Sequence, residues 1–207
     1  MEDVLDVYAR AYDPKRPQIC FDEKSVQLIA ETRQPLPSKP GQPERFDYEY
    51  QRNGTANLFV FFQPLLGWRH VRVTDRRTKI DFAECMRYLA DDLFPEAETI
   101  VIVLDNLNTH SPASLYEAFE PHEAKRILDR LEFHYTPKHG SWLNMVEIEI
   151  GVLSEQCLDR RISEKDVLES EVVAWETPRN EQKATINWKF STAEARLKLK
   201  RLYPLIS

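Results

Sequence analysis

Three carboxylates in this chain follow apolar runs that lie far apart in the sequence. Asp22 follows Ile-Cys-Phe, Asp105 follows Val-Ile-Val-Leu, and Glu147 follows Trp-Leu-Asn-Met-Val. Carboxylate oxygens are hard ligands of the kind that Mg²⁺ prefers in proteins. Two such ions, held about 4 Å apart, can promote in-line displacement at a phosphodiester. If the fold brings the three side chains together, they predict a metal-dependent enzyme that acts on nucleic acid.

The first two of these carboxylates are predicted to end strands of one sheet. Residues 18–21 indicate a buried strand that terminates at Asp22, with residues 25–29 as a second, separate extended piece. Residues 99–104 are almost entirely Ile, Val and Leu, which is typical of a strand covered on both faces, and Asp105 ends this run. Ligands of α/β sheets collect at the carboxyl ends of strands. We therefore expect Asp22 and Asp105 to share a cleft.

The remaining patterns complete an α/β fold. Residues 55–62 and 68–74 are rich in β-branched and aromatic residues around a turn at 64–67, which predicts a hairpin. The prolines within residues 34–44 exclude a regular helix or central strand and predict a long loop. Further elements are predicted as helices at 1–12, 79–94, 111–128 (interrupted), 143–158 and after Ser163 and Ser191, and as a strand at 132–136. This order predicts helices packed on a mixed sheet.

The composition describes one ordinary globular domain. The chain has 207 residues, of which 42% are hydrophobic and 30% charged, and this is enough to bury a single core. Its formal charge of −6 argues against a dedicated nucleic-acid-binding surface, because nucleic-acid-binding proteins usually carry surplus Lys and Arg. A cluster of metal-binding carboxylates, however, is itself negative until cations occupy it. The charge weakens the nucleic-acid interpretation without excluding it.

The cysteines and the apolar runs bear on the compartment. Cys20, Cys85 and Cys157 are widely spaced within apolar or amphipathic runs, as buried reduced thiols are. No apolar run approaches the roughly 20 residues that a membrane-crossing helix needs, and residues 1–30 contain no signal segment. We expect a reducing, cytoplasmic environment and no membrane partner.

Periodicity alone leaves the third carboxylate ambiguous. In residues 143–158 the apolar positions recur every three or four residues, which predicts one buried helical face. Glu147 and Glu149 flank opposite edges of that face. Helical periodicity therefore cannot choose between them.

Polar side chains accompany the second and third carboxylates in their loops. Asn106 and His110 follow the second one, and His110 lies near a helix start, so it either takes a direct part in the site or forms local hydrogen bonds. Lys138, His139 and Ser141 precede the third carboxylate and could contact phosphate. A solvated polar loop is an equal alternative for these three residues.

Several sequence blocks resemble one protein family. The chain contains, in this order, Phe-Asp-Glu-Lys, Asn-Gly-Thr-Ala-Asn-Leu-Phe, Leu-Asp-Asn-Leu-Asn-Thr-His and His-Gly-Ser-Trp-Leu-Asn-Met-Val-Glu. These blocks resemble transposases of the insertion-sequence 630 family, in the mariner superfamily. The resemblance implies a ribonuclease H-like domain in which Asp22, Asp105 and Glu147 form a DDE triad that holds two Mg²⁺ or Mn²⁺ ions. Because Asn144-x-x-Glu147 is similar to the superfamily's Asn-Pro-x-Glu, Glu147 is preferred, and Glu149 becomes a surface or supporting residue.

The resemblance also implies what the chain does and with which partners. It is expected to be a single catalytic domain, with a core at residues 15–160, C-terminal helices at 161–207, and no amino-terminal helix-turn-helix region. It would cleave and transfer DNA strands, acting on transposon ends and target, as a homodimer or with a full-length transposase partner. The expected setting is cytoplasmic and nucleoid-associated. The number of positions between Asp105 and Glu147 is larger than is typical of the superfamily. The extra length predicts a surface insertion at residues 117–130.

Three alternative functions remain. A nuclease with the same metal site would cut DNA without strand transfer. A regulatory fragment would keep the fold and bind a full-length transposase. Such a fragment would be expected to lose one of the three carboxylates, and here all three are present. A metal-free carbohydrate hydrolase is a weaker alternative, because it needs two carboxylates and has no use for the third.

Overall fold

A mixed sheet forms the centre of the fold, as the sequence patterns predict. The computed structural model describes residues 1–43, 45 and 47–203. Within these residues, the strands are β1 (Gln18–Glu31), β2 (Tyr50–Gln63), β3 (Trp68–Thr74), β4 (Ile100–Leu104) and β5 (Leu131–Tyr135). They form one sheet in the order β3-β2-β1-β4-β5. β1, β2 and β3 pair in antiparallel fashion, whereas β1, β4 and β5 pair in parallel.

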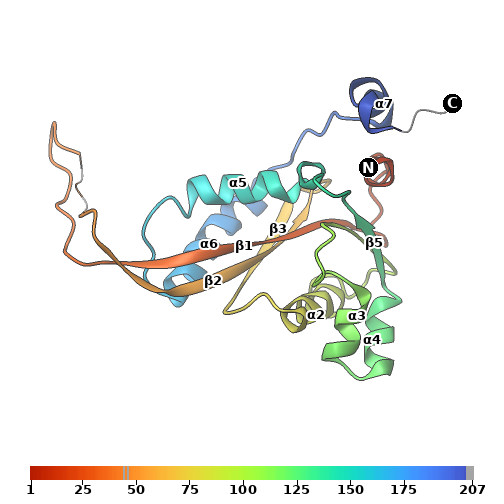
Figure 1. Cartoon of the computed structure of the whole chain (residues 1–207), viewed down its shortest axis with the longest axis horizontal. Helices are drawn as coiled ribbons and strands as arrows, with labels where there is room; N and C mark the ends of the chain where they lie inside the picture. The colour runs from red at the N-terminus through yellow and green to blue at the C-terminus, as the bar shows by residue number, and fades with distance from the viewer. Residues whose placement is uncertain (44, 46, 204–207) are drawn as a thin grey trace.

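Helices cover both faces of this sheet (Figure 1). One face carries α5 (Val146–Gln156) and α6 (Lys165–Glu181), and the other carries α2 (Lys79–Tyr88), α3 (Pro112–Ala118) and α4 (Pro121–Leu128). The shorter helical segments are α1 (Glu2–Tyr8), the π-helical turn η1 (Leu89–Leu93), the 3₁₀ turns η2 (Ser141–Leu143) and η3 (Lys200–Leu202), and α7 (Thr192–Lys198). The predicted α/β arrangement, with helices flanking a mixed sheet, is confirmed.

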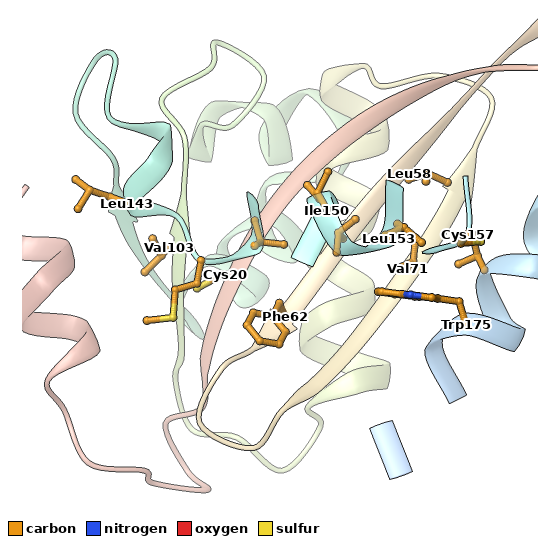
Figure 2. Packing of buried hydrophobic residues seen from close by; sticks show 14 of the residues in the cluster. Cys20, Leu58, Phe62, Val71, Val103, Leu143, Ile150, Leu153, Cys157 and Trp175 are labelled. Carbon is orange, nitrogen blue, oxygen red and sulfur yellow. The ribbon is translucent and has the colours of Figure 1, made fainter. Parts of the chain in front are cut away.

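Strand alternation divides the buried side chains between two hydrophobic cores. On β1, Cys20 belongs to the core under α5 and α6, whereas Ile19 and Phe21 belong to the core under α2, α3 and α4. Figure 2 shows the first core, where Cys20 and Phe62 of the sheet pack with residues such as Ile150 of α5. Successive side chains of a strand point to opposite faces of the sheet. Up to the register shift that follows Gln27, the face on which a β1 residue lies therefore follows from its position relative to Cys20.

β1 is one continuous strand, and this corrects two predictions. The sequence predicts a strand that ends at Asp22 and a separate piece at residues 25–29. Instead, β1 pairs with β2 from Cys20 to Glu31, with one register shift between Gln27 and Ile29. Asp22 therefore lies inside a strand rather than beyond its end. The polar residues that follow it are tolerated because β2 supplies their backbone hydrogen-bond partners.

The far ends of β1 and β2 extend away from the rest of the molecule as a hairpin arm (Figure 1). The proline-rich residues 34–44 fall in the connection between the two strands, where the prediction of a long loop is confirmed for the described residues. Isolated bridges, such as that between Leu36 and Arg45, order part of this connection. The one predicted hairpin, β2 to β3 with its turn at 64–67, also forms.

The region between the second and third carboxylates belongs to the core, which corrects another prediction. The helical pattern at residues 111–128 divides into α3 and α4 at Phe119, whose backbone is extended. Residues 117–130 are not a surface insertion, because Ala124 and Ile127 of α4 are fully buried. This segment thus helps to cover one face of β4 and β5.

Both predicted C-terminal helices are present, but Ser163 does not cap the first of them. α6 begins at Lys165 with Glu164 as its N-cap, so Ser163 does not cap it. α7 begins after Ser191, as predicted, and the side chains of Ser191 and Glu194 form a capping box.

The three cysteines are buried, as the sequence analysis predicts. Cys20, Cys85 and Cys157 are all buried and free. Among the residues that the structure describes, no helix combines the length and the apolar character needed to cross a membrane.

Candidate active site

The parallel pairing of β1 with β4 brings Asp22 and Asp105 side by side. Cys20 lies opposite Val103 in this pairing. Asp22 and Asp105 each follow that pair by two residues. Asp22 shares the face of Cys20, which is the face that α5 covers. The two carboxylates are therefore neighbours at the edge of the sheet where β4 ends.

Glu147 reaches the same region from the first turn of α5. The apolar face of α5, including Ile150 and Leu153, packs on the sheet and directs the start of this helix toward Asp22. Burial raises the pKa of Asp22, and the nearby charges of Asp105, Glu23 and Glu147 raise it further, to about 7, although the backbone N–H of Glu23 acts in the opposite direction. Asp105 and Glu147 thus both lie close enough to Asp22 to affect its pKa.

Among the described residues, Asp22, Asp105 and Glu147 do not form a group of side chains that could hold a metal ion without rearranging. Within residues 1–43, 45 and 47–203, no three His, Cys, Asp or Glu side chains are disposed to hold an ion as they stand. Asp22 accepts the backbone N–H of Glu23 at 2.8 Å, and Glu147 is exposed. The donor set nevertheless fits Mg²⁺ or Mn²⁺, because it consists of carboxylate oxygens whose repulsion a cation would relieve. Glu147 is the side chain that would have to turn inward.

His110 is buried and joins two acidic residues. Its Nδ1 donates to Asp105 Oδ1 at 2.6 Å, and its Nε2 lies 2.9 Å from Glu23 Oε2. This second contact is short, but it does not have the angles of a hydrogen bond, and neither atom has a hydrogen-bond partner among the described residues. Burial lowers the pKa of His110, but the two carboxylates outweigh burial and raise the pKa to about 9. The sequence leaves open a direct part in the site or local hydrogen bonds for His110. The structure shows a local hydrogen bond to Asp105 and, in addition, a close contact with Glu23.

Glu23 is a member of this group that the sequence analysis does not single out. Its side chain is only 3% exposed, and Arg77 lies 3.7 Å from its Oε1. The signal was present in the Asp-Glu pair of the Phe-Asp-Glu-Lys block. A continuous strand through Asp22 places Glu23 on the opposite face, toward His110.

Asn144 ties the third carboxylate to the first strand. Its side-chain Nδ2 donates to the carbonyl oxygen of Phe21 at 2.9 Å, and its backbone carbonyl accepts the N–H of Glu147 at 3.1 Å. Tyr8 of α1 adds a second tie, because its hydroxyl donates to the carbonyl of Leu143 at 2.8 Å. The loop before Glu147 is thereby fixed from two sides.

The other predicted polar residues line one open cavity beside Asp105. It has a volume of about 410 Å³, and its walls are Asp105, Asn106, Leu107, Thr136, Pro137, Lys138, His139 and Ser141. His139 has a left-handed backbone, with φ of 61°. A Cβ on Gly140 would lie 2.6 Å from Pro137 Cγ, so this turn requires glycine. The tight turn presents Lys138 and His139 to solvent at the rim of the cavity.

Glu149 takes no part in this cavity and is not a surface residue, which corrects one of the two roles expected for it. It is 1% exposed. Its Oε1 accepts from Arg69 Nε at 2.9 Å and from Arg179 Nε at 3.0 Å. These contacts link α5 to β3 and α6, so Glu149 is part of a buried ion pair.

Fold and site together define an α/β protein with an acidic site where β1, β4 and α5 meet. Residues 17–169 match the family described as DDE superfamily endonuclease. The chain belongs to this family. No match was found among curated proteins.

Solved structures with a similar fold include DNA-processing assemblies. The Mos1 transposase paired-end complex with left transposon end is 14% identical with a TM-score of 0.57, and the match covers 87% of this chain and 54% of that chain. The Mos1 strand transfer complex is also 14% identical, with a TM-score of 0.56, and covers 84% and 50%. A simian T-cell lymphotropic virus intasome is 12% identical, with a TM-score of 0.51, and covers 96% and 59%. The likeness shows a Mos1-like, ribonuclease H-like fold, and this chain spans about half of the Mos1 chain.

Proposed function

We propose that this chain is the catalytic domain of a transposase of the insertion-sequence 630 kind, which cleaves DNA and joins the cleaved strand to a target. Membership in the DDE endonuclease family supports DNA cleavage. The Mos1 structures, a paired-end complex and a strand transfer complex, support transposon ends and target as substrates. The observation that carries the proposal is the convergence of carboxylates from separate elements: the pairing of β1 with β4 sets Asp22 beside Asp105, and the charge of Glu147 on α5 reaches Asp22.

Asp22, Asp105 and Glu147 would hold the divalent cations of this reaction. Two bound Mg²⁺ or Mn²⁺ ions would supply activation of the attacking water or 3′-hydroxyl and stabilisation of the leaving oxygen. The protein's own part is to present carboxylates in fixed places. Asp22, whose pKa is about 7, is partly protonated at neutral pH and must give up that proton when it binds a cation.

The environment of the two glutamates of α5 supports Glu147 as the third acid. Glu149 already accepts hydrogen bonds from two arginines inside the protein. Glu147 is exposed and has no such partner in the described contacts. Only Glu147 is free to turn toward Asp22 without leaving a buried arginine unpaired.

The cavity beside Asp105 is the proposed place for the DNA backbone. Lys138 and His139 stand at its rim, on a turn closed by the hydrogen bond from the Gly140 N–H to the Pro137 carbonyl. A phosphate there would meet positive charge next to the acidic residues. Lys138 would supply this charge locally, although the chain as a whole has a formal charge of −6.

One assay separates the proposal from its alternatives. The chain is incubated with Mn²⁺, pre-cleaved transposon ends and supercoiled target, and products are scored on a gel. Joined product that disappears in Asp22→Asn supports the transposase. Nicked target without joined product indicates a nuclease, and DNA binding without either product indicates a regulatory domain. Both of these results would contradict the proposal.

A further inference from the structure

A row of three side chains, of which Glu23 and His110 are buried, runs from Glu23 through His110 to Asp105. Asp22 and Glu23 are neighbours on β1 and therefore point to opposite faces of the sheet. Glu23 meets His110 at 2.9 Å on the face covered by α2 and α3, and His110 meets Asp105 at 2.6 Å. The side chains of Glu23 and His110 are 3% and 1% exposed.

The His110 ring is held in place by packing as well as by the two acids. Its centroid lies 4.9 Å from the ring of Phe82 and 5.6 Å from that of Phe21. The hydroxyl of Tyr135 on β5 donates to the backbone carbonyl of His110 at 2.9 Å. Few other orientations are open to an imidazole so confined.

We propose that Glu23 and His110 are positioning residues for the second metal carboxylate. His110 holds one oxygen of Asp105 and fixes the rotation of that carboxylate, while the other oxygen is left for a divalent cation. Glu23 sets the orientation of the imidazole from the opposite face of β1. This inference rests on the proposed function, because it assigns a task to residues beside the proposed metal site.

The burial of Glu23 supports this role. A buried carboxylate is unfavourable unless it is paired, and its described partners are His110 and, at 3.7 Å, Arg77. Removing a hydrogen-bond partner of a metal-binding side chain typically weakens metal affinity about 10- to 100-fold. A residue that acts only by supporting the core would not affect Mn²⁺ affinity in this way.

The test uses Glu23→Gln, which keeps the size of the side chain and removes its charge. The matched control is Glu176→Gln, because Glu176 also pairs with a histidine, His70, at 3.1 Å, but on α6 and β3. Mn²⁺ affinity is measured by calorimetry on the full chain, and thermal melts confirm that each variant folds. The ring N–H signal of His110 is recorded by NMR in metal-free protein with ¹⁵N-labelled histidine and assigned through His110→Asn.

We expect Glu23→Gln to weaken Mn²⁺ binding about 10-fold and to shift the His110 ring signal, whereas Glu176→Gln changes neither. His110→Asn, which can still donate to Asp105, should keep more affinity than His110→Ala. Adding Glu23→Gln to His110→Ala should cause no further loss, because Glu23 acts through the ring.

Two results would overturn the positioning role while leaving the proposed function intact. One is normal Mn²⁺ affinity in Glu23→Gln, and the other is an unchanged His110 signal in that variant. If the unaltered chain binds no Mn²⁺, the proposed function fails and the metal part of this inference fails with it. The ring signal still decides whether Glu23 orients His110.

Discussion

The side-chain amide of Asn144 donates a hydrogen bond to the backbone carbonyl of Phe21, 2.9 Å away. Phe21 precedes Asp22 on β1, and Asn144 lies in the loop that leads to Glu147. This single bond therefore joins the backbone beside the first acid to a side chain of the loop that precedes the third. Asn144 is fully buried, so water does not replace the bond when it is lost.

Asn144→Ala should impair both stability and activity. The substitution leaves the Phe21 carbonyl without its partner, which costs about 1–3 kcal/mol of unfolding free energy. DNA cleavage should fall more than this loss explains, because the loop before Glu147 gains freedom. Urea unfolding and cleavage rates, both measured where the variant is fully folded, provide the check. A rate equal to that of the unaltered chain would show that the bond does not organise the site.

The pH dependence of stability should report the buried Asp22. Its pKa is raised from 3.8 in the unfolded chain to about 7 in the folded protein. The folded state binds the proton more tightly, so metal-free stability is highest below pH 4 for this group and falls as pH rises toward 7. Asp22→Asn should remove this loss and make the metal-free protein more stable near pH 8. Parallel curves for the two proteins in urea titrations from pH 4 to 8 would contradict the expected pKa.

Divalent cations should stabilise the folded chain. A ligand at about 100 times its Kd adds about 2.7 kcal/mol to the unfolding free energy. Saturating Mg²⁺ or Mn²⁺ should therefore raise the melting temperature by several degrees, and Asp22→Asn should abolish the increase. Chelation should reverse it. A melting temperature that does not respond to either metal would argue strongly against the proposed site.

The two glutamates of α5 should behave in opposite ways. Glu147→Gln, at an exposed position, should leave stability within about 0.5 kcal/mol but abolish DNA cleavage. Glu149→Gln breaks the buried contacts with Arg69 and Arg179 and should lower stability by about 3–5 kcal/mol. Comparing melts with cleavage assays at low temperature separates the two effects. The opposite pattern would exchange the roles assigned to them.

Lys138→Ala should weaken DNA binding without regard to sequence. If Lys138 contacts one phosphate, the slope of log Kd against log salt concentration should fall by about 1. Lys125→Ala is a suitable control, because Lys125 is an exposed lysine on α4, paired with Asp129. Binding titrations at several salt concentrations give both slopes. An unchanged slope for Lys138→Ala would mean that the loop is merely solvated.

The elements that surround the site could be predicted because their signals are local. The apolar run before Asp105 identifies β4, and helical spacing identifies α5. The extent of β1 could not be predicted, since the polar residues after Asp22 look like a strand end. They remain in the strand because of pairing with β2, whose residues lie about thirty positions later in the chain.

The partners of the site residues were harder still to foresee. His110 could be expected to bond near Asp105, but its contact with Glu23 depends on which face of β1 each residue occupies. Glu149 meets arginines on β3 and α6, one far before it in the sequence and one after it. Its burial therefore depends on tertiary packing, which helical periodicity alone does not contain.

The long pairing of β1 with β2 also decides which of two adjacent acids faces α5. A slip of one residue in a strand moves every side chain to the other face of the sheet. In this protein such a slip would exchange Asp22 and Glu23, so that each would lie where the other is needed. The pairs that run outward along the arm to Glu31 and Tyr50 resist the slip. Backbone contacts remote from the carboxylates thus determine the identity of the acid that meets Asp105.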